Sequence, residues 1–290
     1  MRFALCQTNS LVGNLEHNSR EILEASRTAA EQGAEIAVFP EMALMGYPPR
    51  DLLDRPHFVE ATQRRCETLA IELKSAGVHT VIFGSMHTVQ THAGIPVRNA
   101  AVIVQEGRIA GFADKMLLPN YDVFDESRYF QPAEGPTLVD LGGRGGGSGD
   151  GGGSGAGAVR VGISVCEDLW NDFQLYPHPR YLIDPIEAMV RGGAQIILNL
   201  SASPFERNKQ GFRRTMVRHA AGRHGVPLIY VNAFGATDDI IFDGGSMAAD
   251  ADGKIIVELA PFRRDIVVID VTPSPPALTA PHGLKAPAVT

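Results

Sequence analysis

Cysteine is scarce in this chain, and long apolar runs are missing. Of the 290 residues only three are cysteines, Cys6, Cys66 and Cys166. An odd and sparse set of cysteines without a secretory leader does not suit a disulfide framework and is typical of the reducing cytoplasm. The chain lacks an apolar stretch near the roughly 20 residues that a membrane helix needs, and its first residues turn polar too early for a signal peptide. The sequence therefore predicts a cytoplasmic protein without a membrane segment.

An excess of basic residues is missing as well. Lysine and arginine number 26 against 33 aspartates and glutamates, which gives a formal net charge of −7. Nucleic acid binds to basic stripes, so we expect no nucleic-acid partner. The histidine pairs His219/His224 and His87/His92 miss the i,i+4 spacing that puts two metal ligands on one helix face. We therefore expect no metal site.

The pattern that is present alternates apolar strands with helical periods. Hairpin signals at Glu106-Gly107 and Asp252-Gly253 add antiparallel pairs to strands that are linked by helices. This combination indicates an α/β fold in which helices cover a mixed sheet. We expect strands at 2–8, 34–39, 78–84, 98–105, 108–114, 159–165, 194–199, 226–231, 244–250, 254–259 and 265–271, and helices at 14–32, 57–75, 180–192 and 207–224.

Two segments have compositions that cannot build a core. Residues 142–157 are mostly glycine, and we expect a flexible loop inside one domain, because the strands on both sides are needed for one sheet. Residues 272–290 are rich in proline and alanine, and we expect a disordered tail or the start of a linker. The folded domain would then be residues 1–271.

Three of the expected strand ends carry reactive side chains, namely Glu41, Lys115 and Cys166. Strand ends that run into irregular backbone are where α/β sheets place functional groups. A free thiol has a pKa of roughly 8.5, so attack on an amide needs help. A carboxylate can take the thiol proton and return it to the leaving nitrogen, and an ammonium can stabilise the oxyanion. The set is sufficient for acyl transfer, although a lone buried cysteine is more often a small apolar side chain.

A family resemblance raises the weight of this interpretation. Phe39-Pro40-Glu41, Lys115 with Leu118-Pro119, and Cys166-Glu167-Asp168 resemble the three signature motifs of the nitrilase superfamily of carbon–nitrogen hydrolases. Longer segments are similar to the glutaminase domain of glutamine-dependent NAD+ synthetases. The ordered series is highly specific and covers about residues 1–271. The segments that are similar to the glutaminase domain are residues 40–53, 118–130, 166–170, 199–205, 230–232 and 242–246.

The resemblance implies an α-β-β-α four-layer sandwich, with Glu41 as general base, Lys115 as oxyanion stabiliser and Cys166 as nucleophile. It implies Glu126 as a supporting carboxylate, for which an exposed charge is an equal alternative. Around bound glutamine it suggests Tyr47, Tyr121, Phe124, Glu167 and Ser203. The alternatives are packed loop aromatics for Tyr47, Tyr121 and Phe124, and a turn residue for Ser203. Lys209 or Arg207 could meet the substrate carboxylate, but a solvated helix start is favoured.

The resemblance also implies partners and cofactors. The hydrolase step would need no cofactor, whereas ATP and deamido-NAD would belong to a second, synthetase domain that carries a Ser-Gly-Gly-x-Asp-Ser loop. That loop is missing from this sequence, so we expect a glutaminase that delivers ammonia to a synthetase domain or subunit. Helix-mediated homo-oligomers are implied too.

Two other functions stay open. One is a free-standing amidase acting on another small amide or carbamoyl compound. The other is a non-catalytic assembly domain, against which the intact Glu41, Lys115 and Cys166 speak.

Overall fold

Two large sheets pack face to face in the computed structural model, which describes residues 1–91, 95–142, 157–175 and 178–275. The first sheet has the strand order β14-β1-β2-β3-β4-β5 and the second β13-β12-β9-β8-β7-β6, and a short hairpin pairs β10 with β11. The first sheet comprises β1 (Arg2–Gln7), β2 (Ile36–Val38), β3 (Thr80–Thr88), β4 (Val97–Gln105), β5 (Arg108–Asp114) and β14 (Asp265–Asp270). The second comprises β6 (Thr137–Gly142), β7 (Ala158–Val165), β8 (Ile196–Ser201), β9 (Leu228–Asn232), β12 (Met247–Ala249) and β13 (Ile255–Glu258), and the hairpin is β10 (Phe234–Thr237) with β11 (Ile240–Asp243).

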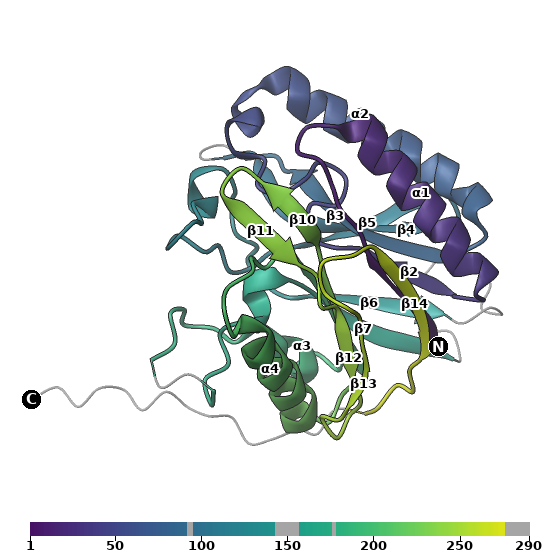
Figure 1. The fold of residues 1–290 in the computed structure, drawn as a ribbon, viewed down its shortest axis with the longest axis vertical. Coiled ribbons are helices and arrows are strands. Elements are labelled where there is room, and N and C mark those ends of the chain that lie inside the picture. Colours follow the sequence, from purple (N-terminus) through teal and green to yellow (C-terminus); the bar gives the residue numbers. More distant parts are fainter. Residues whose placement is uncertain (92–94, 143–156, 176–177, 276–290) are drawn as a thin grey trace, which may run out of the picture.

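Helices cover the outer face of each sheet (Figure 1). α1 (Leu15–Glu31) and α2 (Pro56–Leu73) lie on the first sheet, and α3 (Pro185–Arg191) and α4 (Lys209–His224) lie on the second. Successive side chains of a strand point to opposite faces. In β1, Phe3 and Leu5 therefore join the core between the sheets, while Ala4 and Cys6 pack beneath α1 and α2. The layers are α-β-β-α, which confirms the predicted fold class.

The strand directions bring several strand ends to one edge of the molecule. β2 is parallel to β3, and the two antiparallel steps β3–β4 and β4–β5 make β5 run the same way as β2. In the second sheet β7, β8 and β9 are parallel neighbours. The residues that follow β2, β5, β7 and β8 can therefore meet across the sheet interface.

The structure corrects some of the expected elements. The predicted helix 180–192 begins only at Pro185, because Asp184 caps it by accepting the backbone N–H of Glu187 at 3.0 Å and the proline suits the first helical position. The strand β6 and the β10–β11 hairpin were not predicted from the sequence. The predicted strand 244–250 is limited to β12, because the residues before it form a turn in which Gly244 and Gly245 have positive φ angles.

The two segments of unusual composition lie mostly outside the described residues. β6 and β7 pair antiparallel with Gly142 opposite Ala158, so the glycine-rich segment joins two strands of one sheet, and its residues 143–156 lie outside the described part of the chain. Of the predicted tail, residues 272–275 are in neither a helix nor a strand, and residues 276–290 are likewise outside the description.

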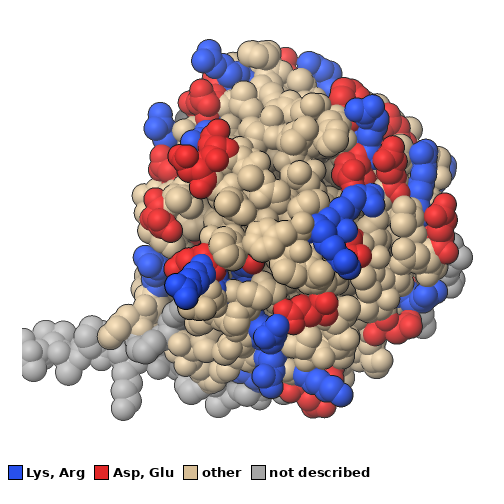
Figure 2. Space-filling view, in the orientation of Figure 1, with Lys and Arg blue, Asp and Glu red and all other residues tan. Residues whose placement is uncertain are grey.

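Surface character agrees with the composition. Within the described ranges, none of the helices is both long and apolar enough to cross a membrane. Figure 2 shows acidic and basic side chains interspersed over one face of the molecule, rather than gathered into a basic stripe there.

Candidate active site

Cys166 stands at the end of β7, where the chain turns into a short 3₁₀ helix, Cys166–Leu169. Its backbone φ is +41°, an angle that residues other than glycine rarely adopt. The residue is 5% exposed, and burial, followed by the nearby charge of Glu41, raises the pKa of its thiol well above the ordinary value. The resting thiol is therefore protonated, and attack requires a base.

Glu41 is placed by a close approach between two strands. After β2 the backbone passes over Gly84 of β3, whose N–H donates to the Pro40 carbonyl at 3.0 Å. A Cβ on Gly84 would lie 2.2 Å from the backbone nitrogen of Met42, so only glycine fits there. The Glu41 carboxylate then reaches the second sheet, where its Oε2 accepts the backbone N–H of Ala202 at 2.9 Å.

Lys115 follows β5 and is wholly buried between two carboxylates. Its Nζ lies 2.8 Å from Glu41 Oε1 and 2.8 Å from Glu126 Oε1. Burial disfavours the ammonium, but Glu126 and Glu41 outweigh burial and raise the pKa of Lys115 well above its ordinary value. The lysine is therefore a fixed cation beside the thiol, and its charge counteracts the upward shift in the pKa of Cys166.

Glu126 belongs to this buried network, which corrects the alternative of an exposed charge. It is 4% exposed, and its Oε1 also accepts the hydroxyl of Tyr47 at 2.8 Å. Burial raises the pKa of Glu126 to about 7, against the influence of Lys115. Asn99 of β4 joins the two acids, because its Nδ2 lies 2.7 Å from Glu41 Oε1 and 3.4 Å from Glu126 Oε2. Sequence reasoning missed Asn99, although a polar residue within an apolar strand was a signal that could have found it.

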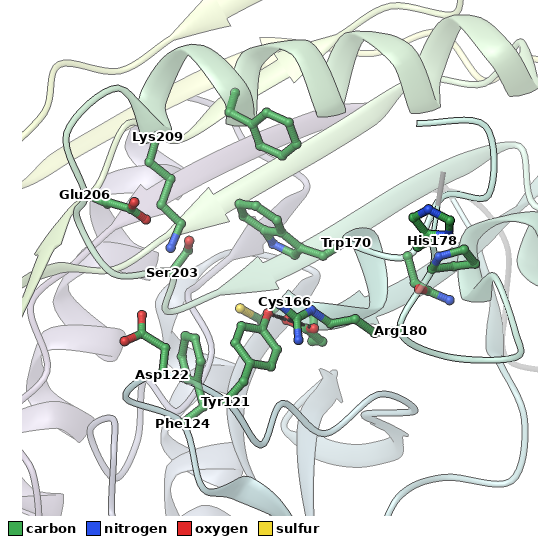
Figure 3. Close-up of a pocket in the computed structure, with 14 residues that line it drawn as sticks. Tyr121, Asp122, Phe124, Cys166, Trp170, His178, Arg180, Ser203, Glu206 and Lys209 are labelled. Atoms are coloured by element: carbon green, nitrogen blue, oxygen red, sulfur yellow. Dashed lines mark hydrogen bonds between the residues drawn. The ribbon is translucent and has the colours of Figure 1, made fainter. Parts of the chain in front are cut away.

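A cavity of about 710 Å³ opens above Cys166 (Figure 3). Four of the five residues predicted around the substrate line it with Cys166, namely Tyr121, Phe124, Glu167 and Ser203. The fifth, Tyr47, departs from the prediction: it lines a separate hollow of about 290 Å³ that includes Glu126, because its ring packs on Phe242 and its hydroxyl is directed at that carboxylate.

The cavity walls carry charges of both signs. Glu167 accepts hydroxyl hydrogen bonds from Tyr121 at 3.0 Å and from Tyr181 at 3.1 Å, and burial raises the pKa of its carboxyl. The guanidinium of Arg180 stacks 3.9 Å above the Tyr121 ring. On another side Lys209 points from the start of α4 toward Ser203, as Figure 3 shows, and burial lowers the pKa of its ammonium.

Lys209 and Arg207 lie in different environments in the structure. Lys209 lines the cavity and is half-buried, which corrects the favoured interpretation of a solvated helix start, while Arg207 is exposed. The difference arises because α4 begins at Lys209, so that its side chain is on the cavity side of the first turn. Sequence reasoning also missed Asp122, Trp170, Arg180, Tyr181, Glu206 and Phe212, which local composition alone did not distinguish.

A second cluster of titratable side chains lies outside the set of residues that line the cavity. Among the described residues, Asp172, Asp184 and His224 bring potential ligand atoms within 4.8 Å of one another. Arg223 already balances their charge, because its Nη1 lies 2.9 Å from Asp172 Oδ1 and 3.0 Å from Asp184 Oδ2. The cluster is an internal ion-pair network around an arginine.

Comparison with known proteins decides the family. The model of the carbon-nitrogen hydrolase family matches residues 2–275. This chain belongs to the carbon-nitrogen hydrolase family. The glutamine-dependent NAD(+) synthetase of Synechocystis is 35% identical to this hydrolase over 99% of the chain but only 49% of that protein, and the one of Thermotoga maritima is 34% identical over 93% of the chain and 42% of that protein. The hydrolase thus spans about half the length of the curated relatives that it matches.

Solved structures give the same picture. The glutamine-dependent NAD+ synthetase of Acinetobacter baumannii superimposes on the hydrolase with a TM-score of 0.76 and 26% identity, over 94% of this chain and 48% of that one. An amidase from Nesterenkonia superimposes with a TM-score of 0.72 and 22% identity, over 94% of this chain and 91% of that one, which shows a shared fold. Family and fold make this protein a hydrolase of carbon–nitrogen bonds.

Proposed function

We propose that this hydrolase is a glutaminase, which cleaves the side-chain amide of glutamine through a thioester on Cys166 and releases ammonia. The observation that carries the proposal is the cavity itself, which has the buried thiol at its floor and both a carboxylate and an ammonium on its walls. The relatives named glutamine-dependent NAD(+) synthetases are about twice as long. The ammonia would therefore serve a synthetase domain or subunit, which would also bind ATP and deamido-NAD.

In the proposed reaction Glu41, Cys166 and Lys115 act in successive steps. Glu41 takes the proton from Cys166, and the thiolate attacks the amide carbon. The ammonium of Lys115 stabilises the oxyanion, and Glu41 passes its proton to the nitrogen, so that ammonia leaves and a thioester remains. Water activated by Glu41 then attacks the thioester, which yields glutamate and restores the thiol. Glu126 would keep Lys115 charged and in place throughout.

The cavity walls support an amino-acid amide as the substrate. Free glutamine carries an α-ammonium and an α-carboxylate at its far end, and desolvating both requires partners of opposite sign. Glu167, held by the hydroxyls of Tyr121 and Tyr181, suits the ammonium. Lys209 and the hydroxyl of Ser203 would meet the carboxylate, and Phe124 would pack against the methylene groups.

The decisive experiment measures ammonia released from glutamine by the wild-type chain and by Cys166→Ala, each alone and with a synthetase partner. A glutamine-like electrophile should add a single mass to Cys166, which lines the cavity, and spare Cys6 and Cys66, which are buried in the apolar core of the first sheet. If the wild-type chain releases no ammonia under either condition, or if the label appears on another cysteine, the proposal is wrong.

The fold shared with the Nesterenkonia amidase supports one second candidate, a free-standing amidase that acts on another small amide. The two candidates differ in whether substrate binding requires the charged residues on the cavity walls. For a glutaminase, Glu167→Gln and Lys209→Met should each raise KM for glutamine by roughly tenfold or more, since a charge-assisted contact contributes about 1.5–3 kcal/mol. A small neutral amide such as propionamide should be turned over equally by wild type and variants. Efficient cleavage of propionamide with no use of glutamine would favour the amidase.

We also propose that the protein is cytoplasmic and forms a homo-oligomer. The described cysteines are all unpaired, which suits the predicted cytoplasmic location. The predicted homo-oligomer would be detected by sedimentation equilibrium of the purified chain, and a single monomeric species across micromolar concentrations would refute it.

A further inference from the structure

Asp168 is buried two residues beyond Cys166, and both of its carboxylate oxygens are used by backbone N–H groups. Oδ1 accepts the N–H of Met116 at 3.0 Å and that of Leu117 at 2.8 Å, while Oδ2 accepts the N–H of Val165 at 2.9 Å. The side chain is 1% exposed. It is not among the residues that line the cavity.

These bonds connect the two sheets at the active site. Met116 and Leu117 directly follow Lys115 at the end of β5, in the first sheet, whereas Val165 precedes Cys166 at the end of β7, in the second. β5 and β7 otherwise meet through the apolar core, and apolar contact is non-directional. Hydrogen bonds with defined geometry fix the position of the β5 end relative to the β7 end. Asp168 supplies two such bonds, to Met116 and Leu117, and a third that ties its carboxylate to Val165 at the end of β7.

The same carboxylate also braces a strained turn. The φ of +41° at Cys166 costs about 1–3 kcal/mol and persists only where the surroundings over-determine it. The bond from Val165 N–H to Asp168 closes the chain across Cys166. A contact of 3.5 Å from Asn199 Nδ2 to the Cys166 carbonyl is a further restraint on this turn.

We propose that Asp168 is a positioning residue that holds the Cys166 turn in register with Lys115. The inference rests on the function proposed above, because it assigns Asp168 a role in the same reaction. An ionised carboxylate suits this role since both of its oxygens accept, whereas an asparagine would turn an NH₂ group toward a backbone N–H donor. A misplaced thiol would lie farther from the Lys115 ammonium, so less of it would be thiolate at a given pH.

The test compares wild type with Asp168→Asn at about pH 8.5, because burial raises the pKa of Asp168 to about 7 and the carboxylate is then ionised. The first readout is the rate of Cys166 alkylation by iodoacetamide, with the modified residue located by peptide mass. We expect this rate to fall roughly tenfold or more, since displacements near 1 Å at a reacting group can cost about 10²-fold. The second readout is ammonia release, where kcat should fall while KM for glutamine stays within about threefold.

A matched control separates positioning from general stability. Asp250 likewise accepts two backbone N–H groups, from Asp252 at 3.1 Å and from Lys254 at 2.9 Å, in the turn before β13 and away from the cavity. Asp250→Ala should lower the unfolding midpoint and leave the alkylation rate of Cys166 unchanged. Asp168→Glu retains the charge but moves both oxygens, so it should slow alkylation as the asparagine does, and it replaces that variant if the latter does not fold.

Two results would overturn the inference. One is alkylation of Cys166 within twofold of the wild-type rate in both Asp168 variants, even with a lowered unfolding midpoint, because a merely structural role then suffices. The other is equal slowing in Asp250→Ala. Absence of ammonia release by the wild type would instead refute the proposed glutaminase, while the alkylation rates would still decide the role of Asp168.

Discussion

Replacing Lys115 by methionine should destabilise the fold in a pH-dependent way. The lysine is wholly buried and holds Glu41 and Glu126 at 2.8 Å each, so Lys115→Met leaves two carboxylates near each other without a cation. Breaking a buried ion pair by removing one partner costs about 3–5 kcal/mol. At about 2 °C per kcal/mol for a chain of this length, the melting temperature should fall by about 6–10 °C at neutral pH.

The sign of the pH dependence follows from the two acids. Without the lysine, burial and mutual repulsion raise the folded-state pKa of Glu126 further above its unfolded value, and it is already about 7 in the wild type. A group with a raised folded-state pKa contributes stability that is complete below the unfolded pKa and is lost as pH rises through the folded pKa. The deficit of Lys115→Met relative to wild type should therefore be smaller at pH 5 than at pH 8.

Urea unfolding followed by circular dichroism at the two pH values measures this deficit. Lys115→Met/Glu126→Gln should recover part of the stability at pH 8, because one of the two charges is removed. Lys254→Met, at an exposed lysine, is the matched control and should change the free energy of unfolding by less than about 0.5 kcal/mol. An equal deficit at both pH values, together with no recovery in the double variant, would refute the reasoning.

Three further changes probe how the site is held. Gly84→Ala should displace Glu41 and reduce both the melting temperature and kcat, because its Cβ would lie 2.2 Å from a backbone nitrogen; a fully active variant would contradict the close approach. Asn99→Leu removes the amide that joins the two acids and should lower kcat by about tenfold at unchanged KM, as measured by steady-state ammonia release. Arg213→Met leaves a buried carboxylate unpaired and should cost about 3–5 kcal/mol in urea unfolding, whereas the exposed neighbour Arg214→Met should cost less than about 1 kcal/mol; equal losses would contradict the difference in burial.

Local sequence predicted an α/β fold with helices over a mixed sheet, whereas the division into two six-stranded sheets followed only from the family resemblance. Strand ends are visible as apolar runs that stop, and Glu41, Lys115 and Cys166 each stand at such a stop, so that their convergence needed only the strand order. The start of α3 was also visible, since Asp184-Pro185 is a capping signal, yet the apolar residues just before it extended the predicted helix too far.

The walls and supports of the site were harder to predict because they depend on contacts between distant segments. Glu126 stands among charged neighbours and looks solvated in sequence, but Lys115 and Tyr47 bury it. The direction of the Tyr47 ring is set by its packing on Phe242, and Lys209 faces a cavity whose other walls come from segments far away along the chain. The local periodicity of the sequence does not indicate such contacts.

The buried reacting residues, here called the floor, and the charged residues that line the cavity, here called the walls, are tested by different experiments. The buried set of Glu41, Lys115 and Cys166 would serve the hydrolysis of any small amide, because its contacts involve only the reacting atoms. Recognition of a free amino acid would instead require the charges of Glu167 and Lys209, which stand on separate elements of the cavity wall, the 3₁₀ helix after β7 and the start of α4. Variants of the floor therefore test whether the protein hydrolyses amides, and only variants of the walls test whether glutamine is the amide. If both wall variants leave glutamine turnover intact while Cys166→Ala abolishes it, the site is an amidase whose substrate is selected elsewhere.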